Sequence, residues 1–194
     1  MRVVGYVRDT PDPSEAEPAF AQAERVRRWI KDSGHQLVAI CQDVRTAGRT
    51  LGRDGYRAMI GVLSTGEAEA VLVPSLDALS PDKVAQEIML WDLRARNIAV
   101  LSATEPDLEL LSDPPPDSLR ILIRDVLAKV VDHVDMVGMG ALPLSEPETP
   151  SLPATGQPPE IELEADDDES GVVVELIPPR PGDPFRRSRI NPAL

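Results

Sequence analysis

An alternation of short apolar runs with helix-patterned segments over residues 1–138 constrains this chain more than any other feature. Four runs rich in Val, Ile, Leu and Ala have the length and composition of buried strands, and they cover residues 2–8, 36–41, 70–74 and 98–101. Each run is followed by apolar positions at helical spacing. This order predicts an α/β, doubly wound fold with a mostly parallel sheet of four to five strands, because parallel neighbours need right-handed crossover helices.

The last helix of this region is expected to be long and unusually apolar. It follows three prolines at residues 114–116, and its apolar positions form a stripe wider than one sheet face needs. Soluble monomers rarely leave a large aliphatic patch uncovered, so the excess indicates a partner helix. We expect a homodimer, with dimerisation through Leu119, Leu122, Val126, Leu127, Val130 and Val134.

A change of composition divides the chain into a domain at residues 1–138 and a tail at residues 139–194. Eleven of the 20 prolines lie beyond Gly140, where Phe185 is the only aromatic residue. Such a segment cannot bury a core, so we expect a disordered, acidic, Pro-rich tail. It holds an acidic run at residues 160–169 and an apolar patch at residues 172–177. The patch is either idle linker or a strand for a partner's sheet, so residues 160–190 are the predicted contact with a protein partner.

Charge and cysteine content exclude several classes of function. The net charge of −13, from 33 acidic and 20 basic residues, disfavours a general polyanion binder. Cys41 is the only cysteine, so no internal disulfide or cysteine-based zinc site is expected. No signal segment or apolar membrane span is apparent. We expect a cytoplasmic protein with no membrane contact, no metal and no cofactor.

The end of the first strand carries the residues best suited to chemistry. Ligands of open α/β sheets bind at the carboxyl ends of the strands, where Arg8 and Thr10 lie. A guanidinium matches phosphate oxygens, and a hydroxyl can attack phosphorus. The simpler alternative is a solvated arginine followed by a threonine that caps the loop.

Several spaced motifs resemble one known family. Residues 5–10, Gly-Tyr-Val-Arg-Asp-Thr, are similar to Gly-Tyr-x-Arg-Val-Ser, and residues 21–25 are similar to Ala-Gln-x-x-Arg. Residues 43–48 with 53–55 resemble Asp-x-x-x-Ser-Gly and Arg-Pro-Gly, and residues 75–81 resemble Lys-Leu-Asp-Arg-Leu-Ser-Arg. Residues 1–138 thus resemble the catalytic domain of serine site-specific recombinases of the resolvase/invertase family. That family attacks a DNA phosphodiester with the serine after Tyr-x-Arg, while arginines hold the phosphate.

The resemblance implies a catalytic set and a DNA-binding set. The catalytic positions are Thr10, Arg8, Gln22, Arg53 and Asp77, and the DNA-binding candidates are Arg45, Arg49 and Arg57. Alternatively, Arg8 and Asp77 pair across strand ends and only hold the sheet edge together. The family also carries a DNA-reading module after the long helix, where this chain has its acidic tail.

The sequence departs from the family pattern at or beside positions that the family uses in catalysis. Thr10 replaces the serine, Ala78 and Pro81 replace arginines, and Asp9 adds a negative charge beside the hydroxyl. These changes favour a catalytically inactive, dimerising regulator or scaffold with a degenerate active site and at most a weak DNA contact. The alternative is an active DNA strand-exchange enzyme that uses Thr10 in place of the serine.

Overall fold

The computed structural model describes residues 1–12, 17–46, 51–136 and 171–178. Its strands are β1 (Arg2–Arg8), β2 (Gln36–Val44), β3 (Ala70–Val73), β4 (Ala99–Ser102) and β5 (Gly171–Leu176). Its helices are α1 (Ala19–Ser33), α2 (Asp54–Ser64), α3 (Lys83–Ala95), α4 (Pro106–Leu111) and α5 (Ser118–Met136), with the 3-10 turn η1 at Leu76–Ala78.

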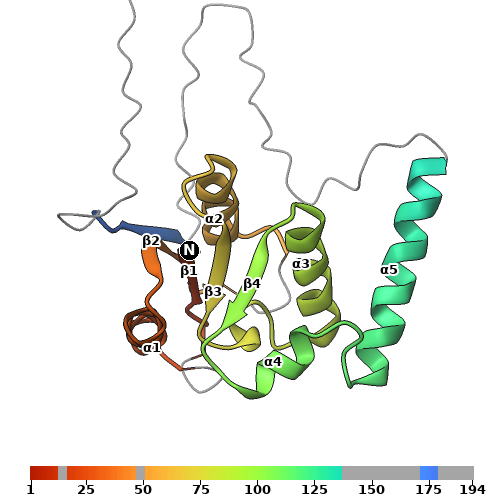
Figure 1. Cartoon of the computed structure of the whole chain (residues 1–194), viewed down its shortest axis with the longest axis horizontal. Helices are drawn as coiled ribbons and strands as arrows, with labels where there is room; N and C mark the ends of the chain where they lie inside the picture. The colour runs from red at the N-terminus through yellow and green to blue at the C-terminus, as the bar shows by residue number, and fades with distance from the viewer. Residues whose placement is uncertain (13–16, 47–50, 137–170, 179–194) are drawn as a thin grey trace, which may run out of the picture.

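The strands form one sheet in the order β4-β3-β1-β2-β5 (Figure 1). β1 pairs in parallel with β2 and β3, β3 pairs in parallel with β4, and β5 runs antiparallel to β2. The predicted α/β fold with a mostly parallel sheet is therefore confirmed. β1 lies at the centre, which puts its carboxyl end between those of β2 and β3.

Alternation along β1 creates two cores, one on each face of the sheet. Val4 and Tyr6 belong to the core shared with α2 and α3, whereas Val3 and Val7 belong to the core shared with α1. All four side chains are fully buried. Because successive strand residues point to opposite faces, Arg8 extends the Val4 and Tyr6 side of the strand. The packing thus places Arg8 at the end of the α2 and α3 face.

β5 differs from the expectation of a tail without structure. Residues 171–176 pair along β2, with Ala39 opposite Leu176 and Val44 opposite Gly171. β2 would otherwise present a row of main-chain N–H and C=O groups, and consecutive valines suit an extended strand. The prediction of disorder is wrong for this segment, while residues 139–170 and 179–194 of the predicted tail lie outside the described residues.

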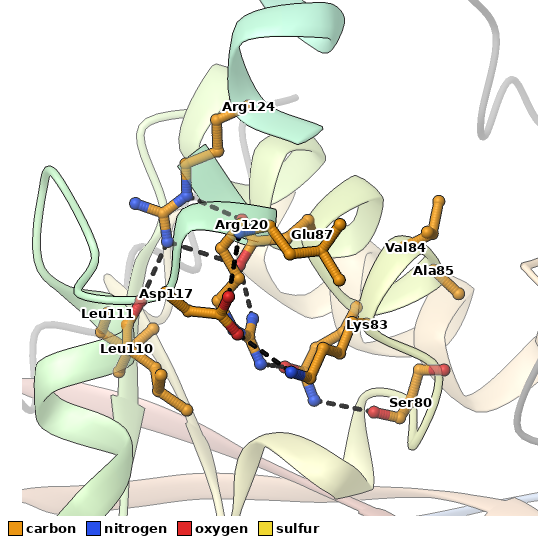
Figure 2. Close-up of polar contacts among 12 residues, drawn as sticks. Ser80, Lys83, Val84, Ala85, Glu87, Leu110, Leu111, Asp117, Arg120 and Arg124 are labelled. Atoms are coloured by element: carbon orange, nitrogen blue, oxygen red, sulfur yellow. Dashed lines mark hydrogen bonds and ion pairs between the residues drawn. The ribbon is translucent and has the colours of Figure 1, made fainter. Parts of the chain in front are cut away.

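α5 stands beside α3 and projects past it (Figure 1). A buried ion cluster fastens its first turns, as Figure 2 shows. Glu87 of α3, with no exposed surface, accepts hydrogen bonds from Arg120 Nη1 and from Arg124 Nε at 2.7 Å. Arg124 also donates to the carbonyls of Leu110 at 2.9 Å and Ser112 at 2.8 Å. Ion pairs with Glu87 therefore attach the amino-terminal end of α5 to α3.

The predicted dimer residues lie on α5 and are mostly uncovered. Leu119, Leu122, Val126 and Val130 are 40–58% exposed, and Leu127 is half-buried. The side chain of Val134 lies outside the described residues. Across the part of the chain that is described, no helix has the length and apolar character of a membrane span.

Candidate functional site

Arg8 holds together the loops that follow β2 and β3. Its side chain is 3% exposed. Nε donates to the Ala78 carbonyl, Nη1 to the Thr46 carbonyl and Nη2 to the Asp77 carbonyl, each at 3.2 Å. The Asp77 side chain is exposed. The guanidinium thus binds three main-chain carbonyls in the two loops after β2 and β3. The simpler sequence interpretation expected only an ion pair with the Asp77 carboxylate.

Arg53 has a similar position beside the same loop. It is 1% exposed, and its Nη1 donates to the Tyr6 hydroxyl at 3.1 Å and to the Leu79 carbonyl. The Tyr6 hydroxyl donates in turn to the Asp43 carboxylate, which also accepts from Gly55 N at 2.6 Å. A Cβ on Gly55 would lie 2.6 Å from that carboxylate, so only glycine fits here. Arg53, Tyr6 and Asp43 form one buried polar chain.

Burial dominates the electrostatics of this chain of contacts. It raises the pKa of Asp43 above its usual value, and the hydrogen bonds from Tyr6 and Gly55 oppose that change. Burial also raises the pKa of Tyr6, and the neighbouring Asp43 charge raises it further. For Cys41, burial raises the pKa of the thiol to about 12. The charged forms of these three side chains are therefore disfavoured.

Gln22 and Thr10 complete the end of β1. Gln22 accepts from Arg8 N at 3.2 Å and donates from Nε2 to the Arg8 carbonyl at 2.8 Å and the Glu17 carbonyl at 2.6 Å. The Gln22 side chain of α1 therefore satisfies both main-chain groups of Arg8 at the end of β1. Thr10 is 6% exposed, and its hydroxyl donates to the Asp12 carbonyl at 2.7 Å. The threonine therefore caps its own loop.

A cleft of about 520 Å³ opens at this sheet edge. Arg8, Gln22 and Asp77 contribute to its walls. Its other described walls are Glu17, Arg25, Pro74, Ser75, Ala78 and Pro81. Two of these wall residues, Arg25 and Glu17, form an ion pair at 2.7 Å. The cleft can admit a small polar group beside Arg8, but Ala78 and Pro81 add no charged donor.

The predicted DNA-binding arginines lie apart from this buried set. Arg45 is exposed at the end of β2 with a φ of 50°, and Arg57 is exposed on α2 with Asp54 at 3.5 Å. Arg49 lies outside the described residues. The structure therefore brings Arg8, Gln22, Arg53 and Asp77 together, and leaves Arg45 and Arg57 on the surface.

Sequence reasoning did not identify Tyr6 and Asp43 as site residues, although they bind Arg53. The available signal was a carboxylate inside the apolar strand β2, since a buried acid needs partners. Sequence reasoning also missed the cluster around Glu87. The signal for it was Arg120 and Arg124, two charged residues among the apolar residues of α5. Within residues 1–12, 17–46, 51–136 and 171–178, no group of three His, Cys, Asp or Glu side chains is placed to hold a metal ion.

Similar solved structures are recombinases or the catalytic domains of an integrase and a recombinase. The N-terminal catalytic domain of TP901-1 integrase matches with 18% identity and a TM-score of 0.49, over 71% of this chain and 98% of that one. A resolvase family site-specific recombinase from Streptococcus pneumoniae matches with 16% identity and a TM-score of 0.48, over 71% and 95%. The C-terminal catalytic domain of ISC1926 TnpA, an IS607-like serine recombinase, matches with 16% identity and a TM-score of 0.46, over 74% and 91%.

The sequence itself identifies the family. Among curated proteins, none matches the chain significantly. The family model described as "Resolvase, N terminal domain" matches residues 3–133, which is more than half of the 194 residues and includes β1 to β4. This chain belongs to the resolvase N-terminal domain family.

Proposed function

We propose that this chain is a non-catalytic member of the recombinase family, a regulator or scaffold that self-associates through α5. One observation carries the proposal: the arginines at the catalytic positions are buried and bind main-chain carbonyls. Arg8 is 3% exposed and Arg53 is 1% exposed. A guanidinium that holds two loops in place is poorly available for a phosphate.

The nucleophile position supports the same proposal. A phosphoryl acceptor must direct its hydroxyl at phosphorus, whereas the Thr10 hydroxyl donates to the Asp12 carbonyl. The β-methyl of threonine also restricts χ1 and crowds an in-line approach. Ala78 and Pro81 stand where the family motif has arginines, and loss of each donor costs on the order of 10²–10³ in rate. Two such losses together leave little measurable cleavage.

The exposed apolar residues of α5 support self-association. Leu122, Val126 and Val130 recur at helical spacing and are 58%, 49% and 40% exposed. A second α5 laid along this stripe would remove these side chains from water.

Two further contacts belong to the proposal. Arg45 and Arg57 are exposed, which allows a weak contact with DNA. The tail at residues 160–190 is the proposed contact with a different protein.

Incubation with supercoiled plasmid tests the proposal. The wild-type chain is expected to leave the plasmid supercoiled, and so is Thr10→Ala. Relaxation or nicking by the wild type that disappears in Thr10→Ala would instead establish the alternative, an active strand-exchange enzyme with a threonine nucleophile. Thr10→Ser combined with Ala78→Arg and Pro81→Arg restores the family pattern and is the variant in which cleavage is most expected.

A further inference from the structure

β5 is attached to the sheet in a different way from the other strands. Its residues Val172, Val173, Val174 and Leu176 are 44%, 50%, 41% and 74% exposed, although β5 pairs with β2 along its whole length. Most of β1, by contrast, is buried on both faces. The attachment of β5 therefore depends on main-chain hydrogen bonds much more than on buried side chains.

Apart from β2, β5 lies against α2 and forms an ion pair with α1. Glu175 forms an ion pair with Arg27 of α1, and these side chains are 52% and 36% exposed. Such surface pairs contribute about 0–1 kcal/mol. Beyond the strand, Ile177 N donates to the Val38 carbonyl at 2.9 Å. The ion pair and this hydrogen bond fix the register of the strand and add little to its stability.

The chain between α5 and β5 is long relative to the domain. α5 packs beside α3 near the β4 edge, and β5 lies at the opposite edge of the sheet (Figure 1). Residues 137–170 separate the two elements, a stretch of 34 residues in sequence. A chain of that length can span at most roughly 110 Å. The same connection can therefore reach β2 of its own domain or β2 of a second copy joined through α5.

We propose that the outer edge of β2 is a strand-acceptor site through which copies of this chain exchange β5. Residues 171–176 of one copy then pair antiparallel with β2 of the other, and Glu175 meets Arg27 of that copy. The exchanged contacts are the same as the internal ones, so exchange has little enthalpic cost. This inference rests on the proposed self-association, because two joined copies give each β5 a high effective concentration near the second β2.

A disulfide between β5 and β2 gives a direct test. Val174 lies opposite Cys41, the only cysteine of the chain. Directly opposed residues of antiparallel strands have Cα atoms about 4.5–5.5 Å apart, within the range that a disulfide bridges. A chain with Cys41→Ser and Val174→Cys cannot close this bridge internally. Mixed with wild-type chain carrying a mass tag, it can form the bridge only when its β5 pairs with the tagged chain's β2.

The expected result is a mixed covalent dimer on a non-reducing gel, which disappears with reductant. Copper phenanthroline serves as the oxidant, because burial raises the pKa of Cys41 to about 12 and leaves little thiolate at neutral pH. Cys41→Ser with Val173→Cys is the matched control, since Val173 lies opposite Gln42. This control is expected to give no mixed dimer.

The single variant Val174→Cys carries both cysteines in one chain. If β5 pairs with β2 of the same chain, the two thiols form a bridge and can no longer be titrated. If it closes its own bridge while the mixture gives no mixed dimer, β5 does not exchange and the inference is overturned. Absence of both bridges overturns it too, because β5 then does not pair in this register. Sedimentation of the same samples measures self-association separately, so failure of the proposed dimer is distinguished from failure of strand exchange.

Discussion

At the scale of single residues, the buried polar side chains near the end of β1 are hydrogen-bonded mostly to main-chain groups. Arg8 and Arg53 donate to carbonyls of the loop at residues 77–79, and Asp43 accepts from Tyr6 and Gly55 N. Burying a charge without such partners is costly, so these contacts fix both the loops and the side chains. Arg8 and Arg53, whose side chains are of a type that also binds phosphate, therefore stabilise the fold.

Asp43→Asn should change the pH dependence of stability. Burial raises the folded-state pKa of Asp43 above the unfolded value of 3.8, so the folded state binds the proton more strongly. The free energy of unfolding of the wild type should therefore fall as pH rises from about 4 through the raised pKa. The variant lacks this fall. Urea unfolding of both proteins from pH 4 to 8 measures the difference.

Asp32→Asn, which removes an exposed charge on α1, is the matched control for charge alone. For each variant, the measured quantity is the difference in free energy of unfolding from the wild type. This difference should change with pH more for Asp43→Asn than for Asp32→Asn. A difference for Asp43→Asn that stays constant across the pH range would contradict the cause assigned to the shift.

At the scale of elements, the Glu87 cluster determines how α5 is attached. Glu87→Ala leaves Arg120, which is 4% exposed, without its carboxylate. Breaking a buried pair by removing one partner costs about 3–5 kcal/mol. We expect a loss of this size in the free energy of unfolding, measured by urea denaturation. Asp125→Ala removes the exposed Lys129 pair of the same helix, and its expected cost is about 0.3–0.5 kcal/mol. Equal costs for the two variants would refute a buried anchor.

The apolar stripe of α5 predicts a change in association. Val130→Glu places a charge on a stripe residue that is 40% exposed, so it should weaken the dimer by at least tenfold without unfolding the domain. Ala128→Glu adds the same charge at an exposed position on the opposite side of the helix. Sedimentation equilibrium at tens of micromolar compares the two. A wild-type monomer, or equal weakening by both variants, would count against the α5 interface.

At the scale of the whole molecule, local patterns predicted much of the fold. Apolar runs gave the four parallel strands, and the motif around Arg8 and Asp77 located the candidate site. The sequence could not reveal that residues 171–176 pair with β2, because nothing in that local pattern identifies a partner about 130 positions earlier. Likewise, Arg8 binds main-chain carbonyls, and a carbonyl acceptor leaves no trace in residue identity. Contacts between distant segments account for most of what was missed.

The acidic run at residues 160–169 predicts that the whole chain has a reduced affinity for DNA. It contains seven of the chain's 33 acidic residues, and an anionic segment on the same chain competes with DNA for arginines. Replacing these seven with Asn and Gln should raise DNA affinity while retaining β5. Because each phosphate contact contributes close to one unit, three or four arginines give a slope of roughly −3 to −4 in log affinity against log salt. Mobility shifts across a salt series check this, and unchanged affinity at low salt would remove the tail's opposing role.

The central claim is that this recombinase-family chain does not attack DNA. Covalent trapping tests it most directly: the full chain is incubated with supercoiled DNA, denatured, and separated so that only covalently bound protein stays with the DNA. Wild type and Thr10→Ala should both give no adduct above a protein-free background, because the Thr10 hydroxyl donates to Asp12 and the site arginines bind carbonyls. An adduct formed by the wild type and lost in Thr10→Ala would contradict the account.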